Sequence, residues 1–362
     1  MKKFAALALA GCMAVSLAAC GGSASTSTAA SESTAPAEST SAAESAAESA
    51  AESVTEATQG GKVGVCIYKF DDAFMTTYRN ALQEILEGKG YEVTIVDGNN
   101  DQAKQNEQIN TFITQGVDAL IINPVMTSAA DQIISTVKGA DVPTVLINRE
   151  PTADQMSAYD KLVYVGCDAA QSGTFQGELI LDTENKGDIN GDGKVSYIMI
   201  QGDPENVDAQ YRTEFSVKAL TDAGMEVEEL LKQRGDWDQA KAQQIAQDAL
   251  NQYGDKIEVI FCNNDAMALG ALQAIEAAGR KVNEDIYLVG VDALTEAVQN
   301  VIDGKQTGTV FNNHFAQAQA ASDIAVKFLS GEKVDAVNMV NYEKVTKDNA
   351  QEILDMLKQL IL

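Results

Sequence analysis

The sequence is poor in histidine and cysteine, and both shortages limit the chemistry that the chain can perform. It has one histidine, His314, and five cysteines in 362 residues. Three of the cysteines lie beyond the N-terminal segment, at Cys66, Cys167 and Cys262. Their number is odd, they are widely spaced, and each lies in or at the end of an apolar run, which predicts buried reduced thiols. We therefore expect neither a metal cluster built on cysteine and histidine nor a catalytic thiol. His314 itself is interpreted as a surface or hinge residue.

Basic residues are also scarce, and this excludes several classes of partner. Lys and Arg total 26 against 53 Asp and Glu, which gives a formal net charge of −27. A chain this acidic is a poor partner for nucleic acid or for anionic lipid. The acidic N-terminal part holds no basic helix-turn-helix, so a DNA-binding repressor is rejected.

The sequence has no apolar run long enough for a stable membrane span, and the short run near the start is too short for one. Residues 1–19 carry two lysines and then an apolar run, which is typical of a secretory signal. They lead into Leu17-Ala-Ala-Cys20-Gly21, which resembles a bacterial lipobox and implies cleavage before Cys20 and acylation of its thiol. An ordinary signal peptide cut near the same alanines is the alternative. With lipidation, the chain would be an extracytoplasmic lipoprotein anchored to the cell membrane.

Residues 20–61 predict a disordered spacer behind the lipidated cysteine. They consist mainly of Ser, Ala, Thr and Glu and contain almost no bulky apolar side chains. Such a segment buries too little surface to offset the entropy lost on ordering. We expect it to hold a folded body away from the membrane.

From residue 62 onward, short apolar strands alternate with helix-length amphipathic runs. The strands are nearly continuous in Val, Ile and Leu, as in 119–122 and 195–200. This pattern predicts an α/β fold with parallel sheets covered on both faces. About ten such units are too many for one ordinary open sheet, so we predict two doubly wound lobes joined by a hinge, with a first crossover near Gly166. The expected N-terminal lobe comprises 62–166 and about 314–345, and the C-terminal lobe comprises 167–313 and about 346–362.

Polar side chains directly follow many of the predicted strands. In open α/β sheets, ligands bind at the carboxyl ends of the strands. If the two lobes face each other, these residues line one crevice. They are Asp71, Asp72, Asn148, Arg149, Glu150, Asp203, Asn263, Asn264, Asp265, Asp292, Asn312 and Asn313.

A second polar motif, Asp188-Ile-Asn-Gly-Asp-Gly-Lys-Val-Ser196, matches the beginning of a calcium-binding loop of EF-hand type. Its oxygen ligands are the side chains of Asp188, Asn190, Asp192 and Ser196 and the backbone carbonyl of Lys194. The bidentate glutamate that usually completes such a loop is missing, because Met199 occupies that position. Either the site is incomplete or a carboxylate arrives from elsewhere in the chain.

Seven segments spread over residues 62–350 resemble the type I periplasmic sugar-binding proteins, and among them the galactose/glucose-binding family. The resemblance implies a two-lobed fold that closes on a neutral hexose and delivers it to an ABC permease, with a chemoreceptor as a further candidate partner. It implies no enzymatic activity, and we expect a monomer. The segments are Val63–Met75, Lys104–Ile109, Asn148–Pro151, Gly202–Arg212, Asn263–Ala268, Gly290–Ala293 and Gly308–Asn312.

The resemblance also implies roles for individual residues. Phe74 and Trp237 would sandwich the sugar ring, whose C–H faces pack on aromatic faces. Glu258 would supply the missing carboxylate of a structural Ca²⁺ site. Asn206 stands where the family has histidine, so the choice between galactose and glucose stays open. The polar ligands of the sugar hydroxyls would be Asp72, Asn148, Asp208, Arg212, Asn264, Asp292 and Asn312.

Two other interpretations of these residues compete with sugar binding. Asp72, Asp208 and Asp292 could form the acid/base pair of a sugar-acting enzyme. Any single Asp or Asn after a strand could instead be a helix N-cap, and the aromatics could be core residues.

The charge of the predicted site bears on its ligand. Three Asp against one Arg argue against an anionic ligand, because a buried cluster of like charge would repel it.

Overall fold

The computed structural model describes residues 60–359. The predicted signal, Cys20 and nearly all of the spacer lie outside the described residues. Within them, no helix is long and apolar enough to cross a membrane.

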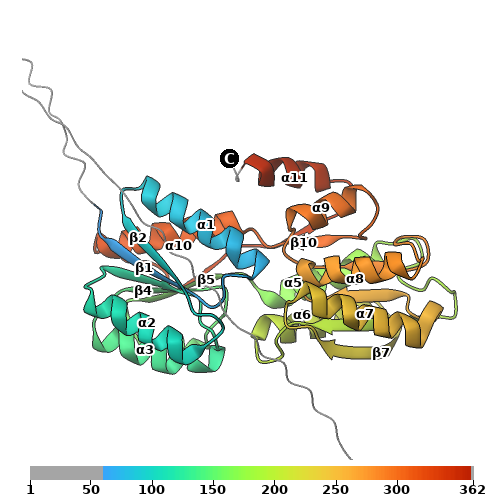
Figure 1. Cartoon of the computed structure of the whole chain (residues 1–362), viewed down its shortest axis with the longest axis horizontal. Helices are drawn as coiled ribbons and strands as arrows, with labels where there is room; N and C mark the ends of the chain where they lie inside the picture. The colour runs from blue at the N-terminus through green and yellow to red at the C-terminus, as the bar shows by residue number, and fades with distance from the viewer. Residues whose placement is uncertain (1–59, 360–362) are drawn as a thin grey trace, which may run out of the picture. The chain divides into compact units, whose positions relative to one another are not determined.

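The N-terminal lobe is built on a parallel sheet with the strand order β11-β5-β4-β3-β1-β2. Neighbouring residues of β1 point to opposite faces of the sheet, as strand geometry requires. Val65 and Ile67 pack beneath α1 and α10, whereas Cys66 packs beneath α2 and α3 (Figure 1). The elements are β1 (Lys62–Ile67), α1 (Ala73–Gly88), β2 (Glu92–Asp97), α2 (Gln102–Thr114), β3 (Ala119–Ile122), α3 (Ala130–Gly139), β4 (Thr144–Ile147), α4 (Ala153–Met156), β5 (Leu162–Gly166), α10 (His314–Leu329) and β11 (Val337–Met339).

The C-terminal lobe repeats this design on a parallel sheet with the order β7-β6-β8-β9. Ile198 and Ile200 of β6 face α7 and α8, while Tyr197 and Met199 face α5 and α6. The elements are α5 (Ala169–Leu181), β6 (Lys194–Gln201), α6 (Val207–Asp222), β7 (Glu226–Arg234), α7 (Gln239–Tyr253), β8 (Val259–Cys262), α8 (Asp265–Ala277), β9 (Tyr287–Val289), α9 (Thr295–Ile302), β10 (Thr309–Phe311), β12 (Glu343–Val345) and α11 (Ala350–Gln359).

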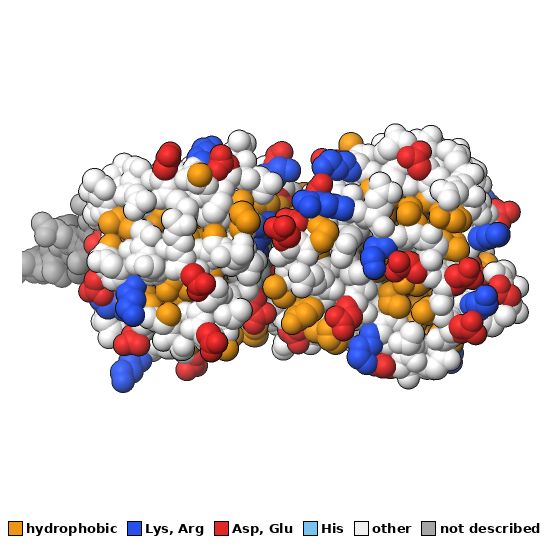
Figure 2. All heavy atoms as spheres, turned by 90° about the horizontal axis from the view of Figure 1, so that it is seen from below, with side chains coloured by type: hydrophobic (Ala, Val, Ile, Leu, Met, Phe, Trp, Pro, Cys, Tyr) orange, Lys and Arg blue, Asp and Glu red, His pale blue; other side chains and the backbone are white. Residues whose placement is uncertain are grey.

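The chain crosses between the lobes three times: after β5, between β10 and α10, and between β11 and β12. The predicted α/β fold with parallel sheets in two lobes is confirmed. One boundary differs, because β12 pairs antiparallel with β10. The chain has therefore returned to the C-terminal lobe before Glu343, slightly ahead of the boundary predicted near residue 345. Figure 2 shows charged side chains of both signs where the two lobes meet.

Candidate functional site

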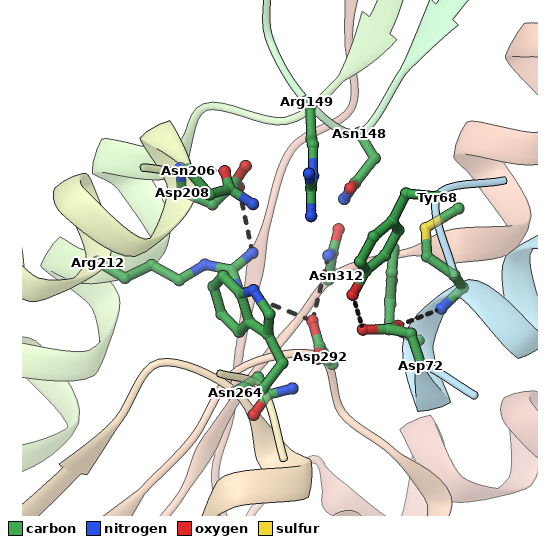
Figure 3. Close-up of a pocket in the computed structure, with 13 residues that line it drawn as sticks. Tyr68, Asp72, Asn148, Arg149, Asn206, Asp208, Arg212, Asn264, Asp292 and Asn312 are labelled. Atoms are coloured by element: carbon green, nitrogen blue, oxygen red, sulfur yellow. Dashed lines mark hydrogen bonds and ion pairs between the residues drawn. The ribbon is translucent and has the colours of Figure 1, made fainter. Parts of the chain in front are cut away.

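A pocket lies between the lobes, at the carboxyl ends of the strands. Its walls are predominantly polar, and side chains from both lobes point into it (Figure 3). The structure brings all ten predicted sugar-site residues together here: Asp72, Phe74, Asn148, Asn206, Asp208, Arg212, Trp237, Asn264, Asp292 and Asn312. Tyr68, Met75 and Arg149 complete the lining. The sequence placed Arg149 among the crevice residues without giving it a role in sugar binding, and it did not indicate Tyr68 or Met75.

On the N-terminal side, Asp72 serves both as a helix cap and as a pocket wall. One carboxylate oxygen accepts the backbone N–H of Met75 at 2.7 Å, and the other accepts the hydroxyl of Tyr68 at 2.6 Å. The capping bond satisfies an otherwise unpaired N–H of the first turn of α1. The N-cap alternative therefore describes Asp72 correctly without removing it from the pocket.

On the C-terminal side, Arg212 is the electrostatic centre. Its guanidinium lies 3.3 Å from Asp208 and 4.0 Å from Asp292, and all three side chains are at least nine-tenths buried (Figure 3). Burial raises the pKa of both carboxyls, and the positive charge of Arg212 opposes the rise. Arg212 thus favours the ionised form of both carboxyls, in which their oxygens accept hydrogen bonds.

The asparagines divide into two kinds according to which amide atom the protein already uses. The oxygens of Asn206 and Asn264 accept backbone N–H groups at the starts of α6 and α8, at 2.9 and 3.0 Å. Their NH₂ groups are therefore left as donors on the pocket side. Asn312 differs, because it donates to Asp292 at 3.3 Å and accepts from Gln317 at 2.7 Å. Asn312 therefore lines the cavity and also orients the Asp292 carboxylate.

Several pocket residues have a backbone conformation that non-glycine residues rarely adopt. The φ angle is 64° at Asn148, 64° at Trp237 and 120° at Asp292. Such conformations cost of order 1–3 kcal/mol each and persist where the surroundings enforce them, often at ligand sites. α7 begins at Gln239, and Trp237 lies in the left-handed turn before it. This turn directs the indole into the pocket.

Gly202 leaves space for the indole, and this gives the first testable prediction. A Cβ at Gly202 would overlap the six-membered ring of Trp237. We expect Gly202→Ala to displace Trp237, shift the emission of this lone tryptophan and weaken ligand binding about tenfold or more, as loss of a well-packed aromatic contact does. The measurements are fluorescence and calorimetric titration. Gly88→Ala, where no atom lies within 4 Å of the added Cβ, is the control. Unchanged emission and affinity in Gly202→Ala would contradict the prediction.

Arg149 was expected at the crevice, but the sequence gave it no part in the sugar site. It is 4% exposed, its guanidinium stacks 4.1 Å from the centre of the Tyr68 ring, and its Nε finds no hydrogen-bond partner among the described residues. It belongs to the polar run 148–150 after β4, and the sequence does not indicate which of these side chains points into the pocket. With Arg149 counted, three carboxylates face two guanidinium groups, so the excess negative charge of the pocket is smaller than predicted.

Of the two interpretations of His314, surface or hinge residue, the structure contradicts the first and agrees with the second. It is 9% exposed at the start of α10, directly after the second crossing, and its ring meets Phe74 edge-on at 6.3 Å. Burial lowers its pKa to about 4, so the imidazole is neutral at physiological pH. Hydrophobic packing next to the crossing explains its burial.

The predicted calcium loop connects α5 to β6, and Glu258 lies against it. Glu258 is 1% exposed, and its two carboxylate oxygens accept the backbone N–H groups of Asn190 at 2.9 Å and Ser196 at 2.8 Å. Asp188 accepts the N–H groups of residues 191, 192 and 193. Within residues 60–359, no three acidic, histidine or cysteine side chains converge on one metal position. The oxygen-rich donor set suits Ca²⁺, with neutral oxygens supplementing the carboxylates.

Comparison with known proteins places this architecture in a family. The chain matches the model of the periplasmic binding protein domain over residues 63–333. The D-galactose/methyl-galactoside binding periplasmic protein MglB of Haemophilus influenzae is 35% identical, over 81% of this chain and 92% of that protein. The ribose import binding protein RbsB of Bacillus subtilis is 28% identical, over 75% of this chain and 83% of that protein.

A solved structure gives the same answer for the fold. An ABC transporter solute binding protein from Bacillus halodurans with bound myo-inositol has a TM-score of 0.73 and 30% identity, covering 83% of this chain and 99% of that one. The family match over residues 63–333 includes every residue that lines the pocket. The chain therefore belongs to the periplasmic binding protein family.

Proposed function

We propose that the pocket binds a neutral hexose of the galactose/glucose type, and that the chain delivers it to an ABC permease. The relatives are solute-binding proteins, so the chain is not an enzyme. In this proposal Asp72, Asp208 and Asp292 accept sugar hydroxyls instead of acting as an acid/base pair. Lobe closure around the ligand would present the form that the membrane partner recognises.

The observation that carries the proposal is the pairing of aromatic faces with a mixed ring of donors and acceptors. Phe74 and Trp237 come from opposite lobes and line the same cavity. Carboxylates accept, while the NH₂ groups of Asn206 and Asn264 and the guanidinium of Arg149 donate. A sugar hydroxyl does both, and its ring offers apolar C–H faces.

Charge supports a neutral ligand over an anionic one. The pocket holds three carboxylates and two guanidinium groups, and burial already raises the pKa of Asp208 and Asp292. A further buried negative charge would raise the cost of ionising them. The hexose assignment draws on the galactoside-binding relative, and the myo-inositol-bound structure makes a cyclitol the natural competitor.

A thermal-shift panel tests this proposal directly. A ligand that binds only the folded state raises the melting temperature by mass action, equivalent to about 2.7 kcal/mol at a hundredfold excess over Kd. We expect D-galactose or D-glucose to give the largest shift, D-ribose and myo-inositol a smaller one, and D-galacturonate none. A largest shift from the galacturonate would overturn the neutral-ligand assignment.

Anchoring through Cys20 is part of the same proposal and concerns residues outside those described. It rests on the lipobox-like sequence alone. Mass spectrometry of the protein purified from membranes of its native host should find Cys20 as the acylated N-terminus. A mature protein that begins at another residue would refute it.

We also propose that the loop 188–196 with Glu258 binds a structural Ca²⁺ ion. The residues fit by donor chemistry, and the ion would join the loop to the start of β8. We expect EGTA to lower the melting temperature by about 3 °C or more, because an ion that binds only the folded state adds its binding free energy to stability. Ca²⁺ should restore the midpoint and Mg²⁺ should not. In Glu258→Gln, EGTA should have little effect; an unchanged midpoint in the unmodified protein would refute the site.

A further inference from the structure

The three crossings between the lobes contribute side chains to one buried polar group, here called the hinge cluster (Cys167, Asn312 and Tyr342). Cys167 follows β5, Asn312 follows β10, and Tyr342 lies between β11 and β12. The thiol of Cys167 donates to the amide oxygen of Asn312 at 3.4 Å. Burial raises the pKa of the Cys167 thiol, and the Tyr342 hydroxyl opposes part of that rise. Residues far apart in sequence thus meet where the chain passes between the lobes.

Tyr342 connects this cluster to the pocket without lining it. Its ring is buried, with 5% of the residue exposed, and its hydroxyl accepts a hydrogen bond from Nη2 of Arg212 at 3.0 Å. Its backbone N–H donates to the side-chain oxygen of Gln171 on α5 at 2.9 Å, which fixes the ring's starting point. Burial raises the pKa of the Tyr342 hydroxyl well above its usual value, so the hydroxyl stays protonated.

The other hydrogen bonds of Arg212 come from the body of the C-terminal lobe. Nε donates to Ser172 at 3.3 Å, and Nη1 donates to the carbonyl of Asn263 at 3.0 Å. Nη2 is shared between Asp208 and Tyr342. Among the described residues, Tyr342 is therefore the one hydrogen-bond acceptor of Arg212 that belongs to an inter-lobe crossing. It sets the direction of the guanidinium edge that meets Asp208.

We propose that Tyr342 is a positioning residue, which fixes the Arg212 guanidinium from the third crossing and so makes ligand affinity depend on the hinge. This rests on the proposed function of the pocket. Closure of the lobes requires the crossings to change their backbone angles, and the Tyr342–Arg212 bond carries that change to the pocket. A group outside the cavity would then control how well the cavity binds.

The test compares Tyr342→Phe with Tyr287→Phe. Both substitutions remove one buried phenol hydroxyl in the C-terminal lobe; that of Tyr287 donates to Asn185 at 2.9 Å, away from the pocket. Losing a hydrogen bond to a charged group should raise the Kd of Tyr342→Phe for D-galactose, or for whichever panel monosaccharide binds, about tenfold or more. Tyr287→Phe should bind like the unmodified protein. The two melting temperatures should fall by similar amounts.

A ligand-free readout separates this proposal from the assignment of the ligand. The Arg212 guanidinium lies 5.8 Å from the centre of the Trp237 ring, and Trp237 is the chain's single tryptophan. Released from Tyr342, the guanidinium should shift, and the emission of ligand-free Tyr342→Phe should differ from that of Tyr287→Phe. If no monosaccharide binds the unmodified protein, the proposed function fails and the emission alone decides. Two results would each overturn the positioning role. One is an emission of ligand-free Tyr342→Phe equal to that of Tyr287→Phe. The other, where a sugar binds, is a Kd of Tyr342→Phe within twofold of that of the unmodified protein.

Discussion

Replacing Trp237 with alanine is expected to weaken sugar binding by about 2–4 kcal/mol, or roughly 30- to 1,000-fold in Kd, as loss of a central aromatic anchor does. The indole occupies a left-handed turn that points it into the pocket, with Gly202 leaving room for it. The side chain is half-buried in the ligand-free protein, so the fold should tolerate its loss. Calorimetric titration gives the affinity, and circular dichroism gives the melting temperature.

Two controls make the Trp237 result specific. Trp237→Phe keeps an aromatic face and should recover much of the affinity. Tyr253→Ala, at the C-terminal end of α7 and outside the pocket lining, should leave Kd unchanged. If Trp237→Ala binds as tightly as the unmodified protein, the indole is a packing residue and the stacking model is wrong.

Arg212→Met is expected to destabilise the folded protein by about 3–5 kcal/mol at neutral pH, as removal of one partner from a buried ion pair does. Asp208 and Asp292 would then be left buried without their cation. Urea unfolding followed by circular dichroism measures the change. Sugar binding should fall at the same time, because the two acceptors would no longer be held in place.

The pH dependence identifies the cause of that loss. Burial raises the folded-state pKa of Asp208 and Asp292, and Arg212 lowers it, so the substitution raises both pKa values further. A carboxyl whose folded pKa is raised contributes stability at low pH that is lost as pH rises through that pKa. The deficit of Arg212→Met should therefore be largest near pH 7 and smaller near pH 5.

Arg280→Met is the matched control for this experiment. Arg280 is also buried in the C-terminal lobe, but it donates to the backbone carbonyls of Gly254 and Ile257, and the side chain of its ion-pair partner, Asp285, is 51% exposed. Its deficit should be nearly the same at both pH values. An Arg212→Met deficit that also stays constant would show that the two pocket carboxyls do not depend on this cation.

The fold was predictable because its main signals are local. The near-continuous apolar strand Ala119–Ile122 has the predicted bounds, and the strand predicted over 195–200 is one residue longer at each end. Alternation with helices indicated the parallel class. By contrast, β11 and β12 are three residues long and largely polar or exposed, so no apolar run in the sequence predicts them. Their pairing, and hence the last crossing, depends on contacts with distant strands.

The pocket residues were predictable where they follow the end of a strand, because that position determines the edge of the sheet at which their side chains lie. Asn264 and Asp292 follow strand ends, and parallel strands bring such residues to one edge. Tyr68 was missed, and Arg149 was expected at the crevice without a role in binding, because their place depends on one side chain stacking on the other, which a single sequence does not encode. Tyr342 was missed for a similar reason: it lies in a crossing without a motif and reaches Arg212 only in the folded state.

The most direct test is isothermal titration of the chain with D-galactose and D-glucose, at protein concentrations well above micromolar. Binding of one sugar per chain by the unmodified protein, lost or strongly weakened in Trp237→Ala, is the predicted result. No heat with any neutral monosaccharide of the panel, or equal binding by the two proteins, would contradict the assignment of the inter-lobe pocket as a sugar site.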